Sequence, residues 1–321
     1  MIQFKACLAR ELPAINDALN RATDSLPKPV IPIARHIFDA GGKRLRPLLT
    51  VLTARLLGYT AADILDVAIT LEMLHAATLL HDDILDSALT RRGKPAAHTL
   101  WNVSAVILAG DALLAEGNAL IAARGDPRLS LCFSRATSRT STGEILEIAA
   151  QGRLDTSQED YEEIVRGKTA WLIRAACEMG ALAANAQPQY IEAAAIYGEN
   201  LGMAFQLVDD ALDFAPEAVT GKPTGGDVRE GKLTLPIRLY RENLPPGQRA
   251  AFDTAFSQQT IGADEASAIA AHIRTAGYDS ATRRQAETFL TRARTALDAM
   301  PSGRERDILL DMANYVRDRE K

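Results

Sequence analysis

Two copies of one acidic pattern constrain this chain more than any other feature. Asp82-Asp83-Ile84-Leu85-Asp86 and Asp209-Asp210-Ala211-Leu212-Asp213 share the spacing DDxxD, and each follows an apolar stretch. In a helix, the first and last aspartates of each copy lie four residues apart on one face. Carboxylates in such apolar surroundings lose hydration and repel one another, so they need a cation. Oxygen ligands favour a hard divalent metal, Mg²⁺ first, which indicates a phosphate-bearing substrate.

The alternative interpretation is that these aspartates are ordinary solvated residues. Aspartate clusters are common on exposed helix faces and at helix caps, so one copy alone would be weak support for a metal site. Two copies, both beside apolar sequence, favour the metal-binding interpretation.

Composition and periodicity predict an all-α protein. Of its 321 residues, 47% are hydrophobic and only 5% are aromatic, and alanine and leucine are good helix formers. No linker or low-complexity run divides the chain, so we expect a single catalytic domain over residues 1–321. No window shows period-two alternation, which predicts almost no sheet. Helical spacing predicts helices at 45–58, 61–87, 103–123, 129–152, 159–184, 188–215 and 233–242, with several more over 247–319.

Net charge, cysteine content and the first residues of the chain indicate which kinds of partner and which cellular compartment to expect. The net charge of −5 and the lack of a basic stripe argue against nucleic acid as a partner. Three widely spaced cysteines fit neither a zinc site nor a disulfide framework, which indicates a reducing compartment. The first residues lack a signal-peptide pattern, and we expect no transmembrane segment. The sequence therefore predicts a cytoplasmic protein.

Basic residues near both motifs are candidates for binding phosphate. In 41–47, paired glycines precede a helix start, where backbone N–H groups favour an anion, and Lys43 and Arg46 lie nearby. Arg91 and Arg92 follow the first motif in a basic loop at 90–95, and arginine forks suit phosphate. For the loop at 41–47 the alternative is an ordinary glycine turn with solvated charges.

Three lysines and one histidine extend this set. Lys222 and Lys232 lie in glycine-flanked loops after the second motif, and Lys168 precedes Thr169 in a predicted helix. His75 lies about two helical turns before the first motif, and so on a similar face. A histidine in an apolar helix is usually a core residue, and this alternative stays open.

Taken together, these stretches resemble the trans-isoprenyl diphosphate synthases, the polyprenyl synthetase family. The resemblance covers roughly residues 38–240, and the order of the motifs makes it specific. The matching stretches are 42–47, 72–83, 91–94, 167–170, 206–210 and 231–236.

The resemblance implies the isoprenoid synthase fold, an orthogonal bundle of long helices around a deep central cavity, usually as a homodimer. It implies about three Mg²⁺ ions, with Asp82 and Asp86 as ligands from one wall and Asp209 from the other. Residues that would support the metal cluster are Asp83, Asp210 and Asp213. Contacts to the allylic diphosphate would be Arg91, Lys168, Gln206 and Lys232, with Lys222 on a closing loop. The isopentenyl diphosphate pocket would be Lys43, Arg46, His75 and Arg92, with Thr169 near the reacting carbons.

The expected reaction is a head-to-tail trans condensation. Metal and cationic side chains neutralise the charge that develops on the leaving diphosphate. Isopentenyl diphosphate attacks the resulting allylic cation through C4, and loss of a proton completes the extension. An apolar cavity must exclude water, which would quench the cation.

Small residues before the first motif predict a long product. One helical turn spans about 5.4 Å, roughly one isoprene unit, and Ala77 and Thr78 lie about one turn before Asp82. In the resembling family, bulky aromatic residues there stop growth early. We expect a product of geranylgeranyl size or longer, such as a quinone side-chain precursor for delivery to a membrane. Candidates for the floor are Leu71, Leu74, Phe133 and Thr137.

Other functions remain as alternatives. A farnesyl or geranylgeranyl diphosphate synthase differs only in product length. A terpene cyclase would normally replace the second DDxxD motif, and a non-catalytic subunit of a heteromeric synthase would lose aspartates that are intact here. A purely structural helical protein would not need the basic groups.

Overall fold

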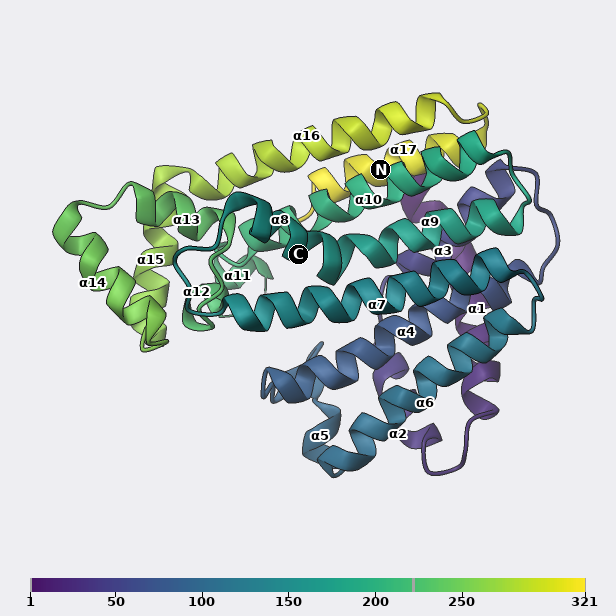
Figure 1. Ribbon diagram of the computed structural model, residues 1–321, viewed down its shortest axis with the longest axis horizontal. Coiled ribbons are helices and arrows are strands. Elements are labelled where there is room, and N and C mark those ends of the chain that lie inside the picture. The colour runs from purple at the N-terminus through teal and green to yellow at the C-terminus, as the bar shows by residue number, and fades with distance from the viewer. Residues whose placement is uncertain (1, 221–222, 321) are drawn as a thin grey trace. The chain divides into compact units, whose positions relative to one another are not determined.

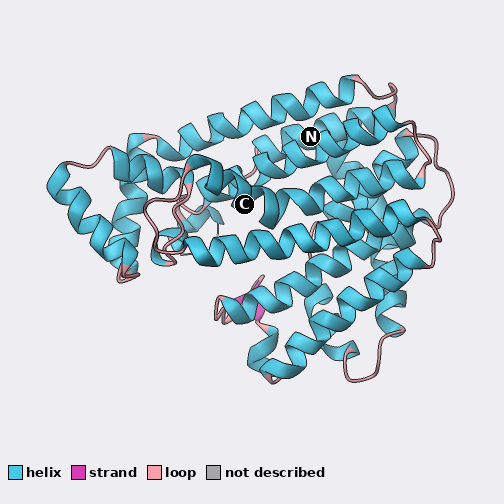
Figure 2. Ribbon diagram, in the orientation of Figure 1, coloured by secondary structure: helices cyan, strands magenta, loops and turns pink. Residues whose placement is uncertain are grey.

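The computed structural model describes residues 2–220 and 223–320, and almost all regular structure in them is helical (Figure 2). This confirms the all-α prediction. Contacts between residues define two compact units, whose boundaries fall within some of the long helices. The first unit contains Met1–Thr137, Ala175–Ala195 and Leu297–Asp311, and the second contains Ser138–Arg174, Ile196–Ala296 and Met312–Lys321. The assignment of the whole chain to one catalytic domain stays a prediction.

The predicted segments agree closely with observed helices, apart from two local differences, but the sequence prediction omits the helices at Ile2–Asp24 and Ile31–Asp39. The segment predicted as one helix at 159–184 is interrupted by a π-helical turn, η1, and the basic loop at 90–95 forms a short antiparallel hairpin. The elements are α1 (Ile2–Asp24), α2 (Ile31–Asp39), α3 (Leu45–Leu56), α4 (Ile64–Leu85), β1 (Thr90–Arg91), β2 (Lys94–Pro95), α5 (Ala97–Leu100), α6 (Val103–Ala122), α7 (Pro127–Ala150), α8 (Gln158–Val165), η1 (Arg166–Ala170), α9 (Trp171–Ala183), α10 (Pro188–Leu212), α11 (Glu217–Thr220), α12 (Gly226–Arg229), α13 (Leu235–Glu242), α14 (Pro246–Ser257), α15 (Ala263–Ala276), α16 (Tyr278–Asp298) and α17 (Arg304–Arg317) (Figure 1).

Helix α4 is the central helix of the first unit and packs against α1, α3 and α6. Glycines in α6 allow this close packing, because a Cβ at Gly117 would lie 3.3 Å from the carbonyl oxygen of Thr70. By length and composition, α4 and α6 are the two described helices that could cross a membrane. The most apolar part of α4 is 67% buried within the protein, as expected for a core helix.

A buried ion pair joins the start of α3 to α4. Arg44 adopts a left-handed conformation with φ of 47° just before α3, and its Nη1 donates to Glu72 Oε1 at 3.0 Å. Its Nη2 donates to the carbonyl of Phe38 at 2.7 Å. Both charged side chains are almost inaccessible, at 7% and 5% exposure. Arg44 therefore fixes the loop that precedes α3.

The second unit has its own apolar core, beyond the second acidic motif. Phe214, which follows that motif, packs with residues of α12 to α15, including Val228, Ile237, Phe256 and Ile273. Phe214, just after the second motif, and Val228, shortly before Lys232, therefore share one core.

Removal of Arg44 tests the importance of the buried pair. Arg44→Ala leaves Glu72 buried without its cation, so the free energy of unfolding is expected to fall by about 3–5 kcal/mol in chemical denaturation. Arg35→Ala is the matched control, because Arg35 and Asp24 form an exposed pair whose loss costs about 1 kcal/mol or less. Equal effects of the two substitutions would contradict the role given to Arg44.

Candidate active site

Both acidic motifs lie at the C-terminal ends of long helices. The first ends α4, and the second ends α10 and continues to Asp213. These two helices are described in full, and neither has a basic residue in its last turn. The carbonyl end of a helix already carries partial negative charge, so added carboxylates are unfavourable there without a cation. Carboxylate oxygens are ligands that suit a hard divalent cation such as Mg²⁺. Among the described residues, however, no three such side chains converge into a group that could hold a metal ion.

Within the first motif, the three aspartates differ in their surroundings. Asp82 is partly exposed and Asp86 is exposed, and the Asp86 N–H donates to the Asp82 carbonyl at 2.8 Å. Asp83 is only 1% exposed and accepts from Arg91 Nε at 2.7 Å. Asp82 and Asp86 are therefore accessible to a metal, whereas Asp83 holds the loop that carries Arg91.

The β1–β2 hairpin reaches the glycine loop before α3. Arg92 Nη1 donates to the carbonyl of Gly41, and Lys94 Nζ donates to that of Asp39 at 2.7 Å. A Cβ at Gly42 would lie 2.8 Å from Arg92 Nη1, so a side chain there would displace the end of the Arg92 side chain. Two basic groups predicted separately from the sequence are thus brought together, with Lys43 exposed on the same loop.

A neutral histidine lies among these arginines. Burial lowers the pKa of His75 well below its usual value, and the charges of Arg46, Arg92, Arg91 and Arg44 lower it further. The Nε atom of Arg46 is buried without a hydrogen-bond partner. Such a concentration of positive charge suits an anionic ligand. On the same helix, Ala77 and Leu74 are buried and Thr78 is partly exposed.

In the second motif, the first aspartate is paired with the C-terminal segment. Asp209 contacts Arg319 Nη2 at 2.8 Å, and the side chain of Arg319 is 9% exposed. The guanidinium lies over the ring of Phe205, 4.0 Å from its centroid. Sequence reasoning missed Arg319, because 110 positions separate it from Asp209 and the C-terminus lacks a motif that indicates the contact.

Asp210 is part of a buried hydrogen-bond chain. It accepts from the hydroxyl of Tyr161 and from Gln206 Nε2 at 2.8 Å, and Thr169 Oγ1 donates to Gln206 Oε1 at 2.6 Å. Burial raises the pKa of Asp210 to about 7, and the negative charges of Asp209 and Glu147 also raise it. The hydrogen bonds from Tyr161 and Gln206 act in the opposite direction and lower it.

The last aspartate of the second motif is bound to the loop that leads to Lys232. Asp213 accepts from the backbone N–H groups of Gly226 at 3.2 Å and Asp227 at 3.1 Å. Burial raises the pKa of Asp213. Burial also raises the pKa of Asp227, and the negative charges of Asp213 and Asp210 raise it further. Asp227 is a further carboxylate that sequence reasoning missed. Its position between the second motif and Lys232 could have indicated that it lies near the site.

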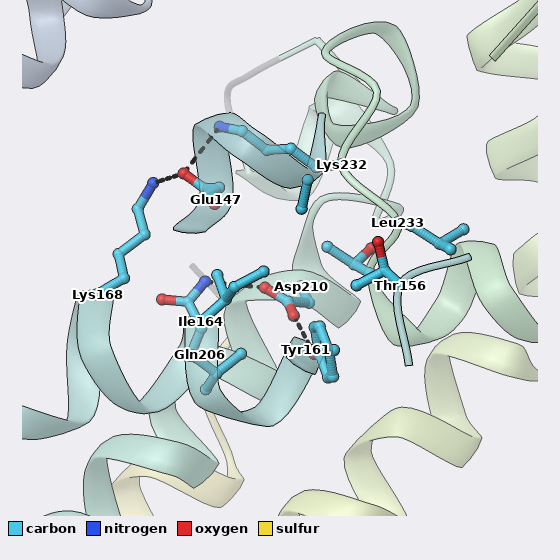
Figure 3. A pocket seen from close by; sticks show the side chains of 12 residues that line it. Glu147, Thr156, Tyr161, Ile164, Lys168, Gln206, Asp210, Lys232 and Leu233 are labelled. Atoms are coloured by element: carbon cyan, nitrogen blue, oxygen red, sulfur yellow. Dashed lines mark hydrogen bonds and ion pairs between the residues drawn. The ribbon is translucent and has the colours of Figure 1, made fainter. Parts of the chain in front are cut away.

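The π-helical turn η1 brings Lys168 to α7. A Cβ at Gly167 would lie 2.5 Å from Gly143 Cα, so the two backbones meet at paired glycines. Lys168 contacts Glu147, and Lys232 Nζ lies 3.8 Å from the same Glu147 Oε2 (Figure 3). These side chains line a cavity of about 50 Å³ together with Gln206 and Asp210. Single π turns inside helices are frequent at functional sites.

The structure thus places the predicted residues in two groups, one in each unit. Lys222 lies outside the described residues. The first unit holds Asp82, Asp83, Asp86, Arg91, Arg92, Lys43, Arg46, His75, Ala77, Thr78 and Leu74. The second holds Asp209, Asp210, Asp213, Gln206, Lys168, Thr169 and Lys232.

Comparison with known proteins identifies the family. The family model for polyprenyl synthetase matches residues 28–273. The chain belongs to the polyprenyl synthetase family. It is a prenyltransferase with the isoprenoid synthase fold.

Individual relatives match over almost the whole chain. Heptaprenyl diphosphate synthase component 2 of Geobacillus stearothermophilus is 36% identical over 98% of this chain and 97% of its own length. All-trans-nonaprenyl-diphosphate synthase (geranyl-diphosphate specific) of Rhodobacter capsulatus is 33% identical over 99% of each chain. A crystal structure of Caulobacter crescentus polyprenyl synthase, complexed with calcium and isoprenyl diphosphate, has a TM-score of 0.93 and 34% identity over 99% of this chain and 98% of that chain.

Proposed function

We propose that this polyprenyl synthetase uses Mg²⁺ to condense an allylic diphosphate with isopentenyl diphosphate, head to tail and trans. The product is a polyprenyl diphosphate of geranylgeranyl size or longer. The observation that carries the proposal is the pair of carboxylate clusters at helix C-termini, each with basic side chains in its own unit. The Caulobacter crescentus relative, crystallised with calcium and isoprenyl diphosphate, supports a divalent metal beside such a substrate.

Asp82, Asp86 and Asp209 are the proposed metal ligands, for about three ions. When bound, the metal neutralises negative charge that develops on the leaving diphosphate. One carboxylate oxygen of Asp209, Oδ1, contacts Arg319, so a bound metal would share Asp209 with this guanidinium or replace it. The proposed supporting aspartates are Asp83, Asp210 and Asp213, which already accept hydrogen bonds from the protein.

The basic side chains divide between the two substrates in this proposal. Lysine ammonium groups and the Gln206 amide hold the departing diphosphate, and Arg46 and Arg92 beside His75 hold isopentenyl diphosphate. Thr169 keeps Gln206 oriented through its hydrogen bond. The allylic set is Arg91, Lys168, Gln206 and Lys232, with Lys222 as a further member. The isopentenyl set is Lys43, Arg46, His75 and Arg92.

Ionisation of the allylic diphosphate breaks its C–O bond and leaves a cation. The double bond of isopentenyl diphosphate attacks through C4, and the departed diphosphate takes the proton that is lost. Apolar side chains on α4, such as Ala77 and Leu74, exclude water from the growing chain. We place the reaction in the cytoplasm, with delivery of the product to a membrane.

A farnesyl or geranylgeranyl diphosphate synthase is the second candidate, and product length decides between the two. The small buried side chain of Ala77 favours the longer product. A non-catalytic subunit is disfavoured because both motifs keep all three aspartates.

Neutralising one aspartate in each motif tests the metal assignment. Asp82→Asn and Asp209→Asn each remove a proposed ligand, so kcat for Mg²⁺-dependent diphosphate release is expected to fall by about 100-fold or more. Asp66→Asn is the control, because Asp66 is exposed in the first turn of α4. Full activity of either motif variant, or of the wild type without divalent metal, would disprove the assignment.

A bulky side chain at position 77 tests the path of the product. Ala77→Phe fills space one turn before Asp82, so the main product is expected to shorten. Chromatography of dephosphorylated products from labelled isopentenyl diphosphate and several primers measures this length. Ala77→Ser, which adds a single oxygen, should keep the wild-type length. An active Ala77→Phe enzyme with unchanged products would refute the path along α4.

An exposed apolar face supports the proposed homodimer. Leu100, Val103, Ile107 and Leu108 of α5 and α6 are between 40% and 64% exposed, and a second copy would cover them. Leu108→Asp is expected to convert the dimer to monomer in size-exclusion chromatography with light scattering. Ile2→Asp, at an 86% exposed position, is the control and should leave the dimer intact. A monomeric wild type would contradict the proposal.

A further inference from the structure

We propose that Glu147 is a positioning residue that holds Lys168 and Lys232 in the substrate-free enzyme and releases both lysines to the allylic diphosphate. The inference rests on the proposed function, because it takes the two lysines as contacts to that diphosphate. Sequence reasoning did not single out Glu147.

The geometry places one carboxylate between two ammonium groups. Glu147 lies in the last turn of α7, Lys168 in η1 and Lys232 in the loop after α12, so three separate elements converge (Figure 3). Lys168 contacts Glu147 Oε2 directly, and Lys232 Nζ lies 3.8 Å from the same oxygen. The three side chains are between 12% and 25% exposed. Water therefore screens these contacts only partly.

The charge around the two lysines is already balanced by the protein. Glu144 lies 3.4 Å from Lys168 Nζ, and Glu230 lies 2.7 Å from Lys232 Nζ. Burial lowers the pKa of Lys168 and of Lys232, but the neighbouring carboxylates outweigh it and raise both. Among the described residues, three carboxylates thus lie within 3.8 Å of the two ammonium groups, and these contacts leave the lysine pair no excess of positive charge for an incoming anion.

Glu147 differs from the other two carboxylates because it contacts both lysines. A diphosphate that binds between the lysines must take the place of this shared carboxylate. The negative charge of Glu147 therefore opposes the binding of free diphosphate between the two lysines. A glutamine at this position keeps the shape of the side chain but removes its charge.

Binding of inorganic diphosphate to the intact chain, measured by calorimetry in the presence of a chelator, tests this inference. Glu147→Gln is expected to bind diphosphate about tenfold more tightly than wild type, because a negative charge next to the site is removed. Glu242→Gln is the matched control: it makes the same change in net charge at an exposed residue at the end of α13, and should bind as wild type. Unchanged or weaker binding by Glu147→Gln would overturn the inference.

Kinetics separates this role from a purely structural one. In Glu147→Gln, KM for the allylic diphosphate is expected to fall while KM for isopentenyl diphosphate stays within about twofold, because the changed charge lies at one of the two substrates. A rise in both constants would indicate a merely structural residue. If Glu147→Gln does not fold, Glu147→Ala removes the same charge and must give the same tightening.

The two hypotheses fail in different ways. Absence of product from the wild type with Mg²⁺ and both substrates would refute the proposed function. The binding measurement with inorganic diphosphate tests the role of Glu147 whether or not the enzyme forms product.

Discussion

Repulsion between carboxylates at the ends of two helices is the constraint on which this protein depends. Each motif gathers three aspartates where the helix carbonyls already carry partial negative charge. Such clusters remain stable only if cations surround them. The basic side chains in each unit neutralise part of this negative charge. The metal that the proposed reaction requires would neutralise more of it.

Before any ligand binds, the protein meets part of that need from its own residues. Asp83 is paired with Arg91, and Asp209 with Arg319. Conversely, the lysines proposed for diphosphate are held by Glu147 and its neighbours. These pairs keep partly buried charges neutralised, and they also mean that binding is an exchange of partners. The same side chains can therefore stabilise the empty protein and bind a metal-bound substrate.

Close backbone packing puts these charges in place. Paired glycines at 143 and 167 bring η1 against α7, which places Lys168 beside Glu147. Gly42 gives Arg92 access to the loop before α3. Between positions 143 and 167 even a methyl group would displace backbone, and at Gly42 it would displace the Arg92 side chain, so small residues are as important to the site as charged ones.

The sequence by itself determined the helical class, the extent of most helices between residues 45 and 242, and the family. Periodicity and motifs are local patterns, so no knowledge of long-range packing is needed to recognise them. It also identified the aspartates and most basic residues as candidates, although their roles remain proposals. Only the tertiary structure decided the partners: Arg319 for Asp209, Tyr161 for Asp210 and Glu147 for two lysines. These contacts join residues between 21 and 110 positions apart, and side chains at such separations meet only when the helices pack.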